Sequence, residues 1–473
     1  MITLMIVVFI AGYIFIAIEH DVGINKAATA IVLGMSLWVM YMLCGAETVI
    51  SANADAFGHF LNANPDYRGL SIDAQCLKFI TGDQIVHFLG EHSQIIFYLM
   101  GAMTIVELID VHGGFAVVTN KITTRDKRGL LWILAFITFF MSALLDNLTT
   151  AIVMTMLIRK LVAVKRDRWL YAGIVIISAN SGGAWTPTGD VTTIMLWIDD
   201  KITTLEILKT LFLPSLVSMI VPLLFVTKYL GGGEVATPAI THRQNASLIV
   251  SSRERLSILI LGISVFLCVP IFKAITHLPP FMGVLLGLGV VWVYMELLYN
   301  RKKNVSDSKQ YRIQNILSRI DTTTILFFLG ILMAVAALQC AGVLAWVSEF
   351  LDSSVHNVYV INSIIGVLSS IVDNVPLVAG AMGAYDMPSI SAAAASANPE
   401  YAMNFIQDGA FWMCLAYCAG VGGSILIIGS AAGVVVMGLE KITFSWYMRN
   451  ISFIALLGYF AGMGVFALER ALF

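Results

Sequence analysis

Apolar runs recur along the whole chain of 473 residues. Most are about 20 residues long, enough for a helix to cross a hydrocarbon core of roughly 30 Å. Because a membrane-spanning backbone must satisfy its own hydrogen bonds, the pattern predicts an all-α polytopic membrane protein. A β-barrel would show short segments of alternating polarity instead. The runs cover residues 2–18, 27–44, 94–118, 130–158, 170–198, 205–229, 256–276, 280–299, 322–349, 358–384, 409–437 and 447–469.

The composition agrees with this class. The chain is 58% hydrophobic and 12% charged, whereas soluble domains carry about 25% charged residues. A net charge of -2 gives no basis for a nucleic-acid partner, and membrane lipid is the expected surrounding. The cysteines are scattered. Cys414 and Cys418 share one helix face, where we interpret both as packing residues.

Loop charge orients the runs, because Lys and Arg gather on the cytoplasmic side of a membrane protein. Loops 119–129 and 159–169 are rich in both and are predicted to be cytoplasmic, yet the run 130–158 lies between them. A single crossing cannot return to the side that it left. The run 130–158 is therefore predicted to be a re-entrant hairpin, or else a crossing paired with one that the pattern hides.

The second half shows the opposite charge pattern. Loops 350–357 and 385–408 contain no Lys or Arg and are predicted to be external, so the run 358–384 should be a hairpin that enters from outside. Loops 230–255 and 300–320 are basic and are predicted to be cytoplasmic. The remaining runs then alternate without conflict, and three parts are predicted outside: the N-terminus, the C-terminus and loop 45–93.

The two hairpins carry the same motif, Leu-Asp146-Asn147-Leu in the first and Val-Asp373-Asn374-Val in the second. A carboxylate within a membrane is costly unless it faces protein, water or an ion. Asx side chains form turns with their own backbone, and Pro376 breaks a helix, so the motifs are predicted at the hairpin tips. Two acids at matching places favour a duplicated ion site. Alternatively, each Asp could cap a half-helix and each Asn could shape a turn.

Other motifs also match between the halves. Ser142 precedes Asp146 by the same spacing with which Ser369 precedes Asp373. The chain is therefore predicted to form two inverted-topology repeats, each with a re-entrant hairpin and a discontinuous helix, as secondary transporters do. The matched breaks are Asn180-Ser-Gly-Gly with Gly420-Val-Gly-Gly and Gly189-Asp190 with Gly429-Ser430. The predicted parts are residues 1–229, a cytoplasmic linker 230–255, and residues 256–473, with discontinuous helices at about 170–198 and 409–437.

The break in the run 170–198 offers oxygen ligands of the kind that hard cations prefer. Glycines and Pro187 prevent a continuous helix there. Proton and cation would compete for the same buried acids, which gives antiport by alternating access. The candidate ligands are Ser142, Asp146, Asn147, Asn180, Ser181, Asp190, Thr192, Thr193, Ser369, Asp373 and Asn374, with Na⁺ expected at Asp146, Asn147, Asp373 and Asn374.

Three further acids lie in or next to other apolar runs. Glu107 and Asp110 lie in the run 94–118 and could form a proton pathway or a hydrogen-bonded pair. Asp321 precedes the run 322–349 and is expected to cap a helix. The Ser and Thr candidates could equally be small packing residues between helices.

At this point the chain resembles the NhaD-type sodium/proton antiporters of the ion transporter superfamily. The resemblance rests on S-x-x-x-D-N in one half, S-x-x-x-D-N-x-P in the other, and N-S-G-G-A-x-T-P-x-G-D-x-T-T. It implies exchange of Na⁺ or Li⁺ for H⁺ in a bacterial inner membrane by a homodimer, without a cofactor. By motif position it implies roles for Ser142, Asp146, Asn147, Asn180, Asp190, Thr192, Thr193, Ser369, Asp373 and Asn374.

The competing hypothesis is a sodium-coupled carrier of an organic anion or a metalloid on the same scaffold. Such a carrier predicts basic or aromatic residues at mid-membrane, but residues 130–158, 358–384 and 176–193 contain no Lys or Arg. Related dicarboxylate carriers have Ser-Asn-Thr at the hairpin tips, where this chain has Asp-Asn. An enzyme would need a nucleophile with its base or a metal motif, and the sequence predicts none.

Overall fold

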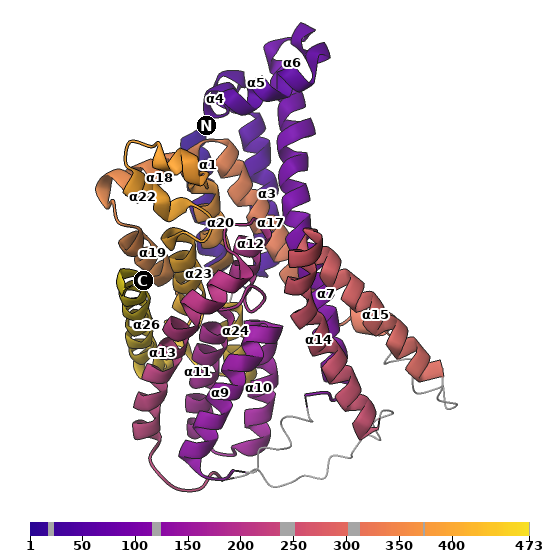
Figure 1. Cartoon of the computed structure of the whole chain (residues 1–473), viewed down its shortest axis with the longest axis vertical. Coiled ribbons are helices and arrows are strands. Elements are labelled where there is room, and N and C mark those ends of the chain that lie inside the picture. Colours follow the sequence, from indigo (N-terminus) through magenta and orange to yellow (C-terminus); the bar gives the residue numbers. More distant parts are fainter. Residues whose placement is uncertain (18–22, 116–123, 237–250, 301–312, 372–373, 473) are drawn as a thin grey trace. The chain divides into compact units, whose positions relative to one another are not determined.

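The computed structural model describes residues 1–17, 23–115, 124–236, 251–300, 313–371 and 374–472. Every regular element in these ranges is a helix, which confirms the all-α prediction (Figure 1). In the first half the helices are α1 (Ile2–Ala17), α3 (Lys26–Met42), α4 (Ala46–Ala52), α5 (Ala54–Ala63), η1 (Pro65–Gly69), α6 (Ile72–Phe79), η2 (Ile80–Gln84), α7 (Ile85–Val111), α9 (Lys127–Leu145), α10 (Asn147–Leu161), α11 (Lys165–Gly183), α12 (Val191–Ile198) and α13 (Thr204–Leu230).

The second half continues in the same way. Its helices are α14 (Ser252–Thr276), α15 (Pro280–Asn300), α16 (Ile313–Leu317), α17 (Thr322–Cys340), α18 (Val343–Ser354), α19 (Val358–Leu368), α20 (Asn374–Ala384), α21 (Ile390–Ala394), α22 (Pro399–Ala402), η4 (Met403–Phe405), α23 (Ala410–Gly422), α24 (Ala431–Glu440), α25 (Phe444–Tyr447), η5 (Met448–Ser452) and α26 (Phe453–Leu472). Asp321 caps α17 as predicted, because its Oδ1 accepts a hydrogen bond from the Thr324 N–H at 3.1 Å.

Within these ranges, seven helices are long and apolar enough to cross a membrane, and α3 with α4 makes an eighth span if the pair, bent by 105°, is counted as one. The polytopic prediction is therefore confirmed. The structure has fewer candidate spans than the sequence has apolar runs, because several runs are divided into shorter helices. The runs 170–198, 358–384 and 409–437 each contain two helices, and the run 322–349 divides at Gly342, which has φ 74°.

Residues 45–93, which the sequence analysis treats as an external loop, are largely helical. Short helices follow one another there, and one helical stretch then runs without a break from Ile72 to Val111, over 40 residues. Several polar residues of this helix lie on exposed positions, among them Asp73, Lys78 and Asp83, whereas Gln84 is buried and accepts a hydrogen bond from the Tyr41 hydroxyl. His87 and Glu91 form an i,i+4 pair at 3.1 Å.

The chain forms two compact units, and each combines segments from both sequence halves. Unit 1 comprises Met1–Ile96, Asp321–Asn357 and Val375–Met387, and unit 2 comprises Phe97–Ile320, Val358–Asn374 and Pro388–Phe473. In unit 1, α3 packs along α17, and the Trp38 Nε1–H donates to the Met333 carbonyl at 2.9 Å. The predicted division into repeats 1–229 and 256–473 stays a prediction, since compactness and repetition are different properties.

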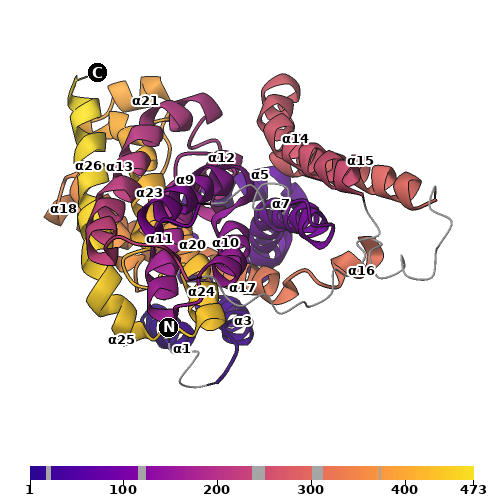
Figure 2. The same ribbon diagram turned by 90° about the horizontal axis from the view of Figure 1, so that it is seen from below.

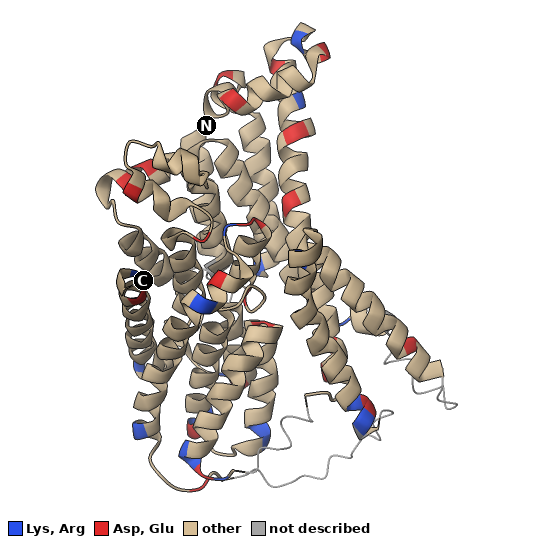
Figure 3. Ribbon diagram, in the orientation of Figure 1, with Lys and Arg blue, Asp and Glu red and all other residues tan. Residues whose placement is uncertain are grey.

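In unit 2, α9 and α10 form a helical hairpin beside α11 (Figures 1 and 2). The open ends of the hairpin meet at the start of α11. There Lys127 Nζ lies 2.6 Å from Asp167 Oδ2, and Arg168 donates to the Val162 carbonyl at 3.4 Å. Lys and Arg gather at this end of unit 2 (Figure 3). The run 130–158 therefore returns to the end of unit 2 where it started, whereas its re-entrant course in a membrane stays a prediction.

Candidate ion-binding site

The discontinuous helix of the first half brings a carboxylate into the interior of unit 2. α11 ends at Gly183, the chain unwinds through residues 184–190, and α12 begins after Asp190. Asp190 is only 1% exposed and is the N-cap of α12: its Oδ1 accepts the Thr192 N–H at 3.1 Å. Thr193 completes a capping box with the Asp190 backbone. The break therefore positions one acid at the positive end of a helix.

The asparagines of the two hairpin motifs meet at this carboxylate. Asn147 donates from Nδ2 to Asp190 Oδ2 at 2.7 Å. Asn374 Nδ2 lies 3.3 Å from Oδ2 and 3.4 Å from Oδ1 of the same side chain. Asn147 and Asn374 are both buried. The structure thus gathers the predicted candidates Asn147, Asp190 and Asn374 around one point.

Asn180 extends the cluster to the second discontinuous helix. Its Oδ1 accepts a hydrogen bond from Asn147 at 3.2 Å, and its Nδ2 donates to Ser424 Oγ and Ser430 Oγ, both at 2.9 Å. The two serines belong to the break between α23 and α24, and Ser430 caps α24 as Asp190 caps α12. The sequence analysis did not select these serines. Their position in Gly420-Val-Gly-Gly-Ser424 and Gly429-Ser430, the break that matches the one around Asp190, could have identified them.

Asp146 has a different role from Asp190. It separates α9 from α10 at φ 132°, and both of its carboxylate oxygens are engaged by Thr149, from the backbone N–H at 2.7 Å and from the hydroxyl at 2.8 Å. This is the helix cap that the sequence left open as the alternative. Asp373, the matching acid, lies outside the described residues. Sodium binding at either acid therefore stays a prediction.

The remaining serine candidates hold helices together. Ser142 donates to the Ala179 carbonyl at 2.6 Å, and Ser369 donates to the Ala419 carbonyl at 2.9 Å. Each serine thus joins the first helix of a hairpin to the helix that precedes a break, at matching positions of the two halves. Ser181 instead accepts a hydrogen bond from Ser218 of α13 at 2.8 Å.

Two glycines at the ends of α11 and α23 repeat this correspondence. A Cβ at Gly182 would lie 2.2 Å from the Phe139 carbonyl oxygen, and a Cβ at Gly422 would lie 2.1 Å from the Gly366 carbonyl oxygen. Phe139 and Gly366 are each three residues before the matched serines. These equivalent contacts support an internal repeat, whereas its inverted topology stays a prediction.

Three candidate side chains make no hydrogen bond within the polar cluster, although the Thr192 backbone N–H donates to Asp190. The Thr192 hydroxyl is buried and has no hydrogen-bond partner in the part of the chain that the structure describes. Glu107 and Asp110 are on α7. Neither makes a hydrogen bond to the Asn147, Asn180 or Asp190 side chain, so the structure does not join them to the cluster.

Comparison with known proteins identifies the scaffold. The family model described as citrate transporter, CitMHS, matches residues 13–406. The chain belongs to the CitMHS family. Among its relatives, sodium/proton antiporter 1 of Arabidopsis thaliana is 43% identical over 98% of this chain and 71% of the relative. Sodium/proton antiporter 2 of the same plant is 39% identical over 97% of both chains.

A bacterial relative places the chain more narrowly within the CitMHS family. The Na(+)/H(+) antiporter NhaD of Vibrio cholerae is 30% identical over 399 residues, which cover 79% of this chain and 77% of the relative. Together with the plant relatives, this similarity confirms the predicted place of the chain among the NhaD-type transporters of the CitMHS family.

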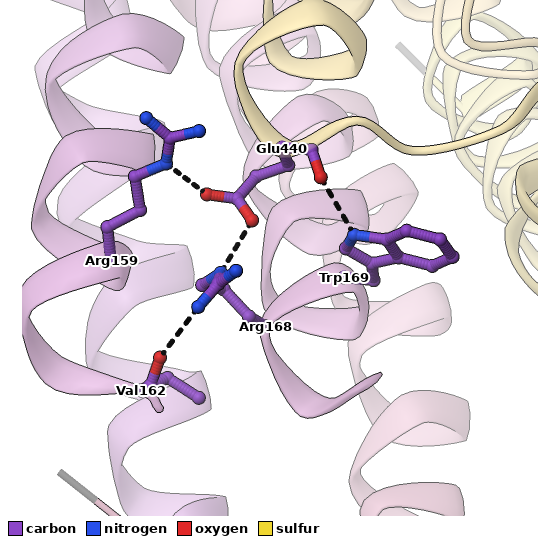
Figure 4. A network of polar contacts seen from close by, with 5 residues as sticks. All are labelled: Arg159, Val162, Arg168, Trp169 and Glu440. Carbon is purple, nitrogen blue, oxygen red and sulfur yellow. Dashed lines mark hydrogen bonds and ion pairs between the residues drawn. The ribbon is translucent and has the colours of Figure 1, made fainter. Parts of the chain in front are cut away.

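One charged cluster in this CitMHS-family chain was missed by the sequence analysis. Glu440, at the end of α24, is 3% exposed and contacts two arginines (Figure 4). Its Oε1 accepts from Arg159 Nε at 2.6 Å, and its Oε2 accepts from Arg168 Nε at 2.5 Å. Trp169 donates to the Glu440 backbone carbonyl at 3.0 Å. The cluster fastens the second discontinuous helix to α10 and α11 of the first half.

Proposed function

We propose that this chain is a secondary active antiporter that exchanges Na⁺ or Li⁺ for H⁺, with Asp190 as the carboxylate that both ions use. The observation that carries the proposal is the convergence of Asn147 and Asn374, one from each hairpin motif, on the buried Asp190 side chain. The names of the relatives support the same exchange, since the similar plant and bacterial proteins are described as sodium/proton antiporters.

The side chains around Asp190 suit a hard monovalent cation. Asn147 and Asn374 each direct an Nδ2 atom toward the carboxylate. A half-turn of each amide would exchange nitrogen for oxygen at the same place, because the two ends of an amide are nearly equal in size. Asp190 and two amide oxygens would then surround Na⁺ with the oxygen ligands that hard cations prefer.

Exchange follows from competition at this carboxylate. A buried carboxylate is stabilised by a proton or by a cation, and binding of one displaces the other. Alternating access would then carry the cation one way and the proton the other. Asp146 and Asp373, at the hairpin tips, are proposed as the second pair of acids in this cycle, and Glu107 with Asp110 as a proton pathway. A homodimer in the inner membrane, with external termini, completes the proposal.

Carriage of an organic anion is the second candidate function, because the matching family model is described as a citrate transporter. Citrate carries several carboxylates, and a site for it would need positive charge or many N–H donors. Asp190 would instead repel such an anion. The absence of Lys and Arg from residues 130–158, 358–384 and 176–193 also favours a cation.

The test is collapse of a pH gradient in everted membrane vesicles after addition of NaCl, LiCl or KCl. We expect Na⁺ or Li⁺ to collapse the gradient with the wild type and not with Asp190→Asn. Asp199→Asn is the matched control, because Asp199 is an exposed acid at the other end of α12 and should keep full exchange. Uptake of labelled citrate by wild type, without any response to Na⁺ or Li⁺, would replace the antiporter with the anion carrier.

A further inference from the structure

Three sulfur atoms form a closed triangle in the interior of unit 2. Cys414 and Cys418 lie on successive turns of α23, with their Sγ atoms 3.8 Å apart. The Sδ atom of Met463, from α26, lies 3.7 Å from the first and 3.8 Å from the second. Both cysteines are fully buried and Met463 is 7% exposed. The sequence alone offered only a packing role for the two cysteines, because Met463 is distant in the chain.

The dimensions of the triangle match those of a three-coordinate metal. The centre of an equilateral triangle with these sides lies about 2.2 Å from each corner, close to the metal–thiolate distance of about 2.3 Å. An ion at the centre would therefore require almost no movement of Cys414, Cys418 or Met463. Thiolate and thioether are soft ligands, which suit Cu(I) and Zn²⁺ among the first-row metals.

Ligand type and ligand number favour Cu(I) over Zn²⁺. A bound Cu⁺ would form a bond to each Cys sulfur as each thiol releases its proton to solvent, because the thiolate and not the thiol is the metal ligand. The Met463 thioether completes the coordination as a neutral donor. The structural sites of Zn²⁺ use four ligands, whereas this triangle offers three.

The surrounding helices hold the triangle in place. The Tyr417 hydroxyl donates to the Tyr459 carbonyl at 2.8 Å, which joins α23 to α26 beside the sulfurs. On the other side, α19 packs closely, since a Cβ at Gly366 would lie 2.9 Å from the Cys418 Cβ. We therefore propose that Cys414, Cys418 and Met463 form a preorganised binding site for Cu(I). Entry of the ion requires brief separation of α23 and α26, because all three sulfurs are buried.

The experiment measures Cu(I) retained by the purified full-length chain in detergent, under anaerobic reducing conditions, against the chelator bathocuproine disulfonate. The parent is a variant in which Cys44, Cys76, Cys268 and Cys340 are replaced by Ala, because Cys44 also contacts a methionine sulfur, that of Met5, at 3.7 Å. We expect one Cu(I) per chain and a higher thermal unfolding midpoint when Cu(I) is added.

Three variants of this parent decide the outcome. Cys414→Ala and Cys418→Ala should each abolish retention, and Met463→Leu, which keeps the apolar volume, should weaken affinity by at least about tenfold. Elution as a single species from a size-exclusion column establishes that each variant is folded. If a folded parent retains no Cu(I), or if Cys414→Ala retains as much as the parent, the sulfurs are packing contacts and the proposal is overturned. This test does not involve transport, so its result is independent of the proposed antiport.

Discussion

Replacement of Glu440 by Gln tests how strongly the second discontinuous helix is fastened to the first half. Gln keeps the size of Glu but has one acceptor oxygen and one NH₂ donor. In the structure both carboxylate oxygens accept hydrogen bonds, one from Arg159 and one from Arg168. The Glu440→Gln variant would therefore turn a donor toward one of the two guanidinium groups. The Trp169 bond is unaffected, because it reaches the backbone carbonyl.

The expected loss of stability follows from exposure. Removal of one partner from a buried ion pair costs about 3–5 kcal/mol. The Glu440 side chain is 0% exposed, the Arg168 side chain 21% and the Arg159 side chain 44%, so water can solvate part of the orphaned positive charge. We expect Glu440→Gln to lower the free energy of unfolding by about 2–4 kcal/mol.

The assay is unfolding in mixed detergent micelles, followed by tryptophan fluorescence, with Trp169 beside the substituted residue as a local reporter. Glu349→Gln is the control, since Glu349 is exposed on α18 and should change little. Arg168→Gln alone and combined with Glu440→Gln completes a double-mutant cycle. Equal stability of Glu440→Gln and Glu349→Gln, or a cycle without coupling, would refute the reasoning.

Two further predictions concern packing and pH. Gly182→Ala should prevent accumulation of folded protein, because its Cβ would lie 2.2 Å from the Phe139 carbonyl oxygen. Gly438→Ala on α24 is the control and should be neutral, because Gly438 has open space around it. The yield of each variant after size-exclusion chromatography distinguishes the two outcomes. The Na⁺ concentration for half-maximal exchange should rise as the pH falls, by about tenfold per unit once the pH is below the pKa of the site carboxyl, because one proton competes with one cation. Vesicle assays at several pH values measure this slope, and a pH-independent value would argue against competition.

The sequence predicted well those features that the membrane itself imposes. Apolar length predicted a polytopic all-helical protein, because lipid tolerates no exposed backbone, and loop charge predicted that the run 130–158 turns back. No helix bounds were assigned within residues 72–93, since hydropathy does not report helix formation in a polar segment. In the structure His87 and Glu91 form an exposed i,i+4 pair on this helix.

The structure brings several of the predicted site residues together, and their role in ion binding stays a prediction. A motif shows which residues are unusual, but it does not show which carboxylate faces inward. At Asp146 the decision came from Thr149, whose N–H and hydroxyl engage both carboxylate oxygens. At Asp190 it came from two asparagines brought from different halves of the chain. Contacts between residues so far apart in the sequence cannot be predicted from a local sequence pattern.

The most direct test of the central claim is proton release when Na⁺ binds to the purified protein in a weakly buffered, dye-containing solution. If Asp190 exchanges a proton for a cation, wild type and Asp199→Asn release protons on addition of NaCl, and Asp190→Asn releases none. A folded Asp190→Asn variant that releases as many protons as the wild type would contradict the claim and assign the exchange to another acid.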